Sequence, residues 1–223
     1  LAFDAYRRLL AAGGNSQLPV RFMFVPEEER GSPYSRKYIK QAAAQAKYAL
    51  VTEPARDGGK VVVARKGSAR FKLKVTGQPA HSGAKHEDGR SAVKEMAHQI
   101  IDLESLTNYD VGLTFNVGVI QGGTAPNVVP GECNIELDCR FVRLGDGEAA
   151  VEKVYNLKPY DPDVTIEASG GISRPPMEEG GNLALFEMAR GFALQHDLDL
   201  QYTPLTGGGS DGNFTSAEGV PTL

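Results

Sequence analysis

The sequence predicts an α/β protein in which a domain built on a parallel sheet is interrupted by a ferredoxin-like domain. Short apolar runs at residues 20–25 and 48–52 flank a helical segment, which is typical of the strand–helix–strand units of parallel sheets. Residues 68–173 change to alternating apolar and polar strands in the order β-α-β-β-α-β. We therefore expect residues 1–67 and 174–223 to form one discontinuous α/β domain, incomplete at both ends, and residues 68–173 to form an inserted domain, here called the lid.

The α/β domain is predicted from apolar periodicity and from helix start and stop signals. An amphipathic helix opens the chain and ends at Gly13-Gly14. A second helix is expected to run from Ser32 to Ala46, with Ser32 as N-cap and Pro33 at the first helical position. Residues 182–195 form a third amphipathic helix, and a fourth follows Ser210 or Asp211. The expected strands, each a short apolar run, are residues 20–25, 48–52, 60–67 and 198–202.

The lid is predicted from strands that bury one face and helices with one apolar stripe. Phe71, Leu73 and Val75 alternate with polar residues, as in a strand that is covered on one side only. Further elements follow from the same patterns, with helices at residues 89–106 and 148–157 and strands at 111–120, 133–141 and 164–168. A Ser-Arg-Pro-Pro run at residues 173–176 is expected to form the stiff return to the α/β domain.

Composition excludes several classes of function. The 223 residues carry a formal net charge of -4, which gives a nucleic-acid partner no electrostatic support. The apolar runs are too short to cross a membrane. Cys133 and Cys139 lie in one expected strand and cannot reach each other, so we predict two buried thiols in a reducing compartment, the cytoplasm.

Carboxylates follow the ends of two expected strands. Glu27, Glu28 and Glu29 come directly after Pro26, and Glu53 follows the strand at residues 48–52. Open α/β sheets bind their ligands at the carboxyl ends of strands, and adjacent carboxylates repel unless a cation or a proton offsets the charge. Because side chains alternate along an extended chain, Glu28 and Glu29 should point in different directions, which suits a general base beside a metal ligand. A solvated acidic turn is the alternative that the triplet alone leaves open.

Four further positions have both a functional and a structural interpretation. His81 sits in a glycine-flanked loop, where a histidine is usually only solvated. Asn127 could serve a turn through its tolerance of left-handed backbone. Arg174 could be a surface charge or a bidentate clamp for a carboxylate. Glycines at residues 207–209 precede a helix and could present N–H groups to an anion or a carbonyl.

The order of these motifs resembles the zinc-dependent carboxypeptidase and aminoacylase family, which includes glutamate carboxypeptidase-type enzymes. The resemblance covers essentially the whole chain. The matching motifs are P-E-E-E-R-G-S at 26–32, T-E-P at 52–54, G-x-P-A-H-S-G at 77–83, G-G-T-A-P-N-V-V-P at 122–130, R-P-P at 174–176 and G-G-G-S-D at 207–211.

The resemblance implies a di-zinc hydrolase whose lid forms a homodimer and whose substrate is a small peptide or an N-acyl amino acid. It implies two zinc ions per subunit, with cobalt or manganese as alternatives. The implied roles are general base for Glu28, zinc ligands for Glu29 and Glu53, a catalytic group reaching the neighbouring subunit for His81, and substrate contacts for Asn127, Arg174 and Gly208.

Part of the family pattern is absent from these residues. The His-x-Asp motif and the metal-bridging Asp are expected before Leu1, and the last zinc-binding His after Leu223. We therefore expect the chain to be a fragment that is inactive by itself. Two other interpretations stay open, a non-catalytic dimerisation or binding module and a deacylase whose substrate is not a peptide.

Overall fold

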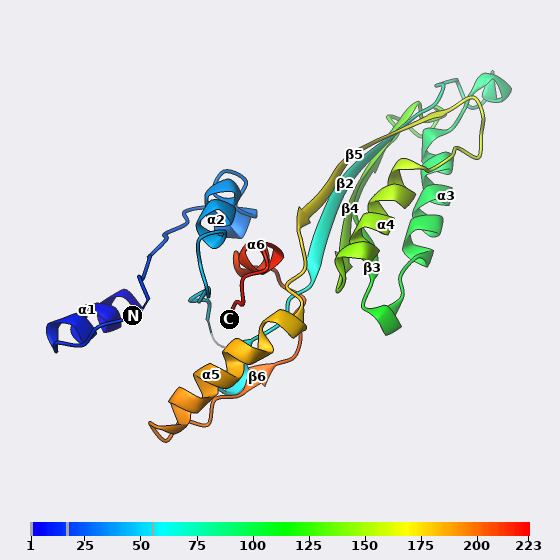
Figure 1. Cartoon of the computed structure of the whole chain (residues 1–223). Coiled ribbons are helices and arrows are strands. Elements are labelled where there is room, and N and C mark those ends of the chain that lie inside the picture. Colours follow the sequence, from blue (N-terminus) through cyan, green and yellow to red (C-terminus); the bar gives the residue numbers. More distant parts are fainter. Residues whose placement is uncertain (1, 17, 55) are drawn as a thin grey trace.

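The computed structural model describes residues 2–16, 18–54 and 56–223, without the side chain of Asp57. Figure 1 shows a four-stranded sheet covered on one face by α3 and α4, while α2, α5 and α6 gather at the other end of the molecule. A second, two-stranded sheet belongs to that end. The predicted α/β class with a ferredoxin-like part is confirmed, and the exact boundaries 68–173 stay a prediction.

The lid sheet has the strand order β3-β4-β2-β5, and all neighbouring strands are antiparallel. This order is that of a ferredoxin-like fold. Its elements are β2 (Gly67–Thr76), α3 (Ala92–Ser105), β3 (Thr114–Gly122), β4 (Glu132–Phe141), α4 (Leu144–Tyr155) and β5 (Thr165–Arg174). Two differ from expectation, since α4 begins four residues before the predicted start at 148 and β5 continues six residues beyond 168.

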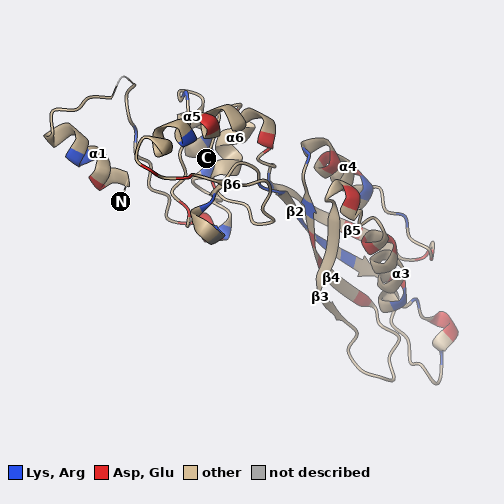
Figure 2. Ribbon diagram, turned by 90° about the horizontal axis from the view of Figure 1, so that it is seen from below, with Lys and Arg blue, Asp and Glu red and all other residues tan. Residues whose placement is uncertain are grey.

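Alternation along β2 and β4 explains why these strands pair in this register. Apolar side chains of both strands enter one core with α3 and α4, as the pattern predicted. Their polar side chains meet on the other face, where Figure 2 shows Lys and Arg along β2. Cross-strand ion pairs there join Arg70 to Asp138 at 3.5 Å, Lys72 to Glu136 at 3.0 Å and Lys74 to Glu132 at 2.7 Å.

Both cysteines are free and buried in β4, as predicted. Burial, together with the charge of the neighbouring Asp138, raises the pKa of the Cys139 thiol to about 12. Burial also raises the pKa of Cys133. Because the thiolate is the reactive form, we expect a thiol reagent such as DTNB to leave the native protein unlabelled at pH 8 and to label two thiols after denaturation. Rapid labelling of the native protein would contradict this burial.

One buried carboxylate anchors the loop between α4 and β5. Glu95 accepts hydrogen bonds from the Tyr160 N–H at 3.0 Å, the Asp161 N–H at 3.1 Å and the Gln99 side chain at 2.8 Å. Glu95→Ala leaves these donors without an acceptor, so we expect a loss of about 2–3 kcal/mol in the free energy of unfolding, measured with urea. Glu95→Gln, which keeps one acceptor oxygen, should lose less. Equal losses from both variants would argue against the hydrogen bonds as the cause.

The α/β part contains α1 (Ala2–Ala11), α2 (Arg36–Ala43), β1 (Val61–Val62), α5 (Leu183–Leu194), β6 (Tyr202–Thr203) and α6 (Gly212–Ala217). Short 3-10 turns lie in this part at Glu28–Arg30, Asp57–Gly59 and Glu179–Gly181. The lid has two more, at His86–Asp88 and Tyr109–Val111. Strands β1 and β6 pair in parallel, and a parallel bridge joins Ala49 to Thr222. The expected strands at 48–52, 60–67 and 198–202 are thus present only as short pieces.

No helix among the described residues is both long and apolar enough to span a bilayer.

The predicted buried strand at residues 20–25 is wrong. The segment is extended, but residues 19–26 form no backbone–backbone hydrogen bond with another described residue. Phe24 is 80% exposed, and Val20 and Met23 are exposed as well. A strand needs a neighbour for its N–H and C=O groups, and the described residues that contact this segment do so through side chains, as Phe3 does on Phe22. Leu1 of the predicted first helix lies outside the described residues.

Candidate functional site

The acidic triplet forms a tight turn in front of α2. Glu28–Arg30 makes one 3-10 turn, and Gly31 and Ser32 follow with φ of 86° and 49°. The Glu27 carboxylate accepts hydrogen bonds from the Ser35 N–H at 2.7 Å and from the Ser35 hydroxyl at 3.0 Å. Partial burial raises the pKa of Glu27, but these hydrogen bonds outweigh it and hold the pKa below its ordinary value.

The predicted N-cap at Ser32 is wrong, and so is the predicted helix start at Pro33. Helix α2 begins at Arg36. The N–H groups of Tyr34 and Ser35 donate to the Glu27 carboxylate, so the Ser32 hydroxyl does not accept from them. The Ser32 hydroxyl is fully buried and instead donates to the Asp211 carboxylate at 2.5 Å.

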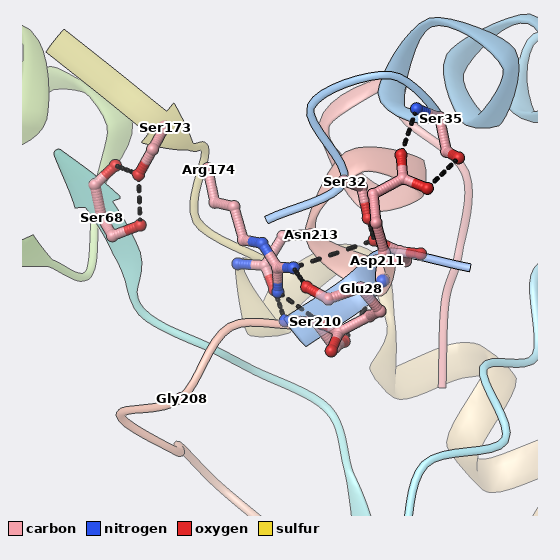
Figure 3. Close-up of polar contacts among 12 residues, drawn as sticks. Glu28, Ser32, Ser35, Ser68, Ser173, Arg174, Gly208, Ser210, Asp211 and Asn213 are labelled. Carbon is pink, nitrogen blue, oxygen red and sulfur yellow. Dashed lines mark hydrogen bonds and ion pairs between the residues drawn. The ribbon is translucent and has the colours of Figure 1, made fainter. Parts of the chain in front are cut away.

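Arg174 binds the turn from the end of the lid. Its side chain donates to the Glu28 carboxylate at 2.7 Å and to the Glu28 carbonyl oxygen at 2.6 Å, as Figure 3 shows. The residue is 8% exposed, and its guanidinium lies 5.7 Å from the centre of the Phe214 ring. A planar guanidinium with two bonds to one residue fixes the orientation of that residue as well as its charge.

Asp211 completes the cluster from the start of α6. One carboxylate oxygen accepts from Ser32 and lies 3.9 Å from Arg174. Burial raises the pKa of Asp211, while the Ser32 hydrogen bond and the Arg174 charge oppose that shift. The loop before α6 is itself fixed, because the Asn213 side chain accepts from the Ser210 N–H at 2.8 Å and donates to the Pro175 carbonyl at 2.8 Å.

Sequence reasoning missed Arg65, a buried arginine beside the glycine loop. It donates to the Gly208 carbonyl oxygen at 3.1 Å. Burial lowers the pKa of Arg65, and the negative charge of Glu53, followed by that of Glu28, opposes the shift. Arg65 and Glu53 both line a pocket of about 100 Å³ between β1 and α6. A charged residue within the apolar run at 60–67 was the signal that could have identified it.

The predicted metal ligands supply only part of a site. Glu29 and Glu53 are exposed carboxylates, and carboxylate oxygen is a suitable ligand for a divalent cation. Within the described ranges, no three His, Cys, Asp or Glu side chains are arranged to hold a metal ion. The described residues therefore supply only part of a metal site.

His81 and Asn127 lie together at the far end of the lid. The Ser82 N–H donates to the Asn127 carbonyl at 3.0 Å, and His81 forms a bridge with Val128. Both side chains are exposed. Strand β2 pairs with Arg174 at its first residues, and its 10 residues span about 33 Å before this loop. Because Arg174 binds Glu28 at the first residues of β2, His81 and Asn127 are separated from Glu28 of the same chain by the length of that strand.

These features define a class of protein, an α/β domain whose acidic turn is bound by the last strand of a ferredoxin-like lid. Comparison with known proteins agrees with that class. Residues 63–157 match the family model for the peptidase dimerisation domain of M20 enzymes. Residues 63–157 are thus a peptidase dimerisation domain of the M20 type.

Relatives of the chain are hydrolases of this family. Carboxypeptidase G2 of Pseudomonas sp. (strain RS-16) is 28% identical over 210 residues, which are 92% of this chain and 50% of that protein. Acetylornithine deacetylase of Myxococcus xanthus is 33% identical over 133 residues, 55% of this chain and 34% of that protein. The chain thus spans about half the length of Carboxypeptidase G2, and its match to the deacetylase covers about a third of that protein.

The fold also matches a solved structure. The aminopeptidase PepT from Bacillus cereus superposes with a TM-score of 0.76 over 99% of this chain and 59% of its own, at 24% identity. At that identity the likeness concerns the fold alone.

Proposed function

We propose that the full-length protein is a di-zinc hydrolase that cleaves an amide bond next to a free carboxylate, in a small peptide or an N-acyl amino acid. One observation carries the proposal. Glu28, Arg174 and Asp211 come from three separate motifs of the family pattern, and Glu28 and Arg174 are 146 positions apart, yet they form one cluster. A solvated acidic turn, the structural alternative, would not need a buried arginine bound to it.

In this proposal Glu28 is the general base. Arg174 holds one oxygen of its carboxylate, and the side chain is 26% exposed, so the other oxygen is available to take a proton from water. Glu29 and Glu53 would contribute to holding zinc, which when bound lowers the pKa of water. Arg174 stays the predicted contact for the substrate carboxylate, although Glu28 already engages its guanidinium.

The lid residues act in a homodimer under the same proposal. His81 and Asn127 are exposed, mutually fixed by their loops and distant from Glu28 of their own chain, which supports a contribution to the neighbouring subunit. There they would donate hydrogen bonds to the developing oxyanion, while Gly208 lies beside the substrate. The cytoplasm stays our predicted location, because two buried free thiols suit a reducing compartment.

Metal removal and substrate choice test the proposal together. The full-length protein, dialysed against a chelator, should lose hydrolysis of dipeptides and N-acyl amino acids and regain it with about two equivalents of zinc per subunit. A matched dipeptide with an amidated carboxyl terminus should be cleaved poorly, because it lacks the charge that Arg174 would bind. A dimer that binds no metal and cleaves none of these compounds would instead indicate a non-catalytic dimerisation module.

A further inference from the structure

The turn that carries Glu28 and Glu29 is held in a conformation that its own residues do not favour. Ser32 adopts φ of 49°, which is uncommon for a residue other than glycine and persists only where surrounding contacts hold it. The backbone of Ser32 is hydrogen-bonded to Glu27 and Arg36, and its side chain adds a buried hydrogen bond from the hydroxyl to Asp211, across 179 positions of sequence. Asp211 therefore fixes one end of the turn from outside it.

Arg174 fixes the other end. Two of its nitrogen atoms bind Glu28, one at the carboxylate and one at the backbone carbonyl oxygen. Asp211 lies 3.9 Å from the same guanidinium, so the two anchors contact each other (Figure 3). The hydrogen bond from Arg174 to the Glu28 carbonyl oxygen holds the backbone of the turn in place. An arginine that only bound a substrate carboxylate would not need this bond.

The position of Arg174 in the fold gives these contacts a consequence. It is the last residue of β5, a strand of the lid, and Ser68 at the start of β2 pairs with it. The lid thus reaches the acidic turn directly through one side chain. A shift of β5 relative to α6 would move the Glu28 carboxylate with it.

We propose that Asp211 and Arg174 are positioning residues, which hold the turn from Glu28 to Ser32 and make the placement of Glu28 depend on the lid strand β5. The inference rests on the proposed function, because it assigns to Glu28 the proton transfer described above. It goes beyond that function by giving Asp211 a role and by giving Arg174 a second one.

Hydrogen exchange tests the positioning without any need for activity. The N–H groups of Arg30, Gly31 and Ser32 are hydrogen-bonded within the turn. In the full-length protein, Ser32→Ala and Asp211→Ala should each speed exchange of these amides by about tenfold or more, because each removes the hydrogen bond between the two side chains. Thr215→Val is the matched control, because Thr215 lies on α6 and its partly buried hydroxyl bonds the Gly212 carbonyl and the Thr222 hydroxyl, neither of which belongs to the turn.

Kinetics then separates positioning from substrate binding. Ser32→Ala and Asp211→Ala should each lower kcat by about tenfold or more with KM nearly unchanged, since small displacements of a catalytic group are costly. The double variant should lose no more than the worse single variant, because both remove the same hydrogen bond. Arg174→Lys should also lower kcat, since one ammonium cannot bind the carboxylate and the backbone carbonyl oxygen of Glu28 in the same geometry.

Each of these experiments has a result that would overturn the proposed positioning roles. Exchange and kcat that match those of Thr215→Val would overturn the role of Asp211. An Arg174→Lys variant that raises KM with kcat unchanged would show that Arg174 serves the substrate alone. A wild-type protein that hydrolyses nothing would defeat the proposed function, while the exchange rates would still confirm or refute the positioning of the turn.

Discussion

Replacing Glu28 with glutamine is expected to lower kcat of the full-length protein by about 10²- to 10⁴-fold, the usual range for loss of a general base. Glutamine has nearly the same shape, and its amide oxygen can still accept the hydrogen bond from Arg174 that is 2.7 Å long in the native protein. The turn should therefore persist, while the proton acceptor is lost. Steady-state kinetics on the best dipeptide or N-acyl amino acid measures the effect.

A matched carboxylate elsewhere serves as the control for this variant. Glu218 forms an ion pair with Lys40 at 2.9 Å, away from the cluster around Arg174. Glu218→Gln should keep kcat within about twofold, as is usual for surface substitutions. Circular dichroism should show the wild-type fold for both variants. A Glu28→Gln protein with wild-type kcat would remove Glu28 from the mechanism and leave its carboxylate a structural partner of Arg174.

Phe141→Ala is expected to have the largest effect on stability, a loss of about 3–5 kcal/mol in the free energy of unfolding of the lid. Phe141 ends β4 and is completely buried. A Cβ atom added at Gly67 would lie 2.3 Å from its ring, and one added at Gly147 would lie 2.5 Å from it. The ring thus fills the space between β2 and α4, and the surrounding backbone cannot close the cavity that alanine would leave.

Urea unfolding followed by tyrosine fluorescence or circular dichroism measures this loss. Tyr109→Ala is the control within the same domain, because Tyr109 is also aromatic but 83% exposed. Its substitution should change the free energy of unfolding by no more than about 0.5 kcal/mol. Similar losses for the two variants would mean that Phe141 does not support the core as described.

The lid was predictable from sequence because the alternation of apolar and polar residues marks each of its strands locally. Alternation of Phe71, Leu73 and Val75 with charged residues determines which face is buried, and it does so whatever lies next to the strand. The order of strands and helices then leaves few topologies that bury one face of the sheet. The positions of the helix ends were less certain, as α4 shows, because capping depends on which neighbours supply the hydrogen bonds.

Local sequence could not decide the structure of the acidic turn. The run at residues 20–25 has the composition of a strand, but pairing requires a second segment, and none among the described residues forms backbone hydrogen bonds with it. Ser32 has the chemistry of an N-cap, yet Glu27 supplies the cap and Asp211 takes the hydroxyl. Both errors arise because the fold, and not the local sequence, determines which hydrogen-bond partners reach a backbone or side-chain group.

The sequence by itself determined the lid, the order of the motifs and the acidic character of the turn, since these depend on periodicity and residue type. Only the tertiary structure decided that Arg174 binds Glu28, that Asp211 binds Ser32 and that Arg65 supports the glycine loop. The physical reason is distance along the chain. These pairs are separated by 146, 179 and 143 positions, and no local pattern encodes which buried charges will meet when such distant segments pack together.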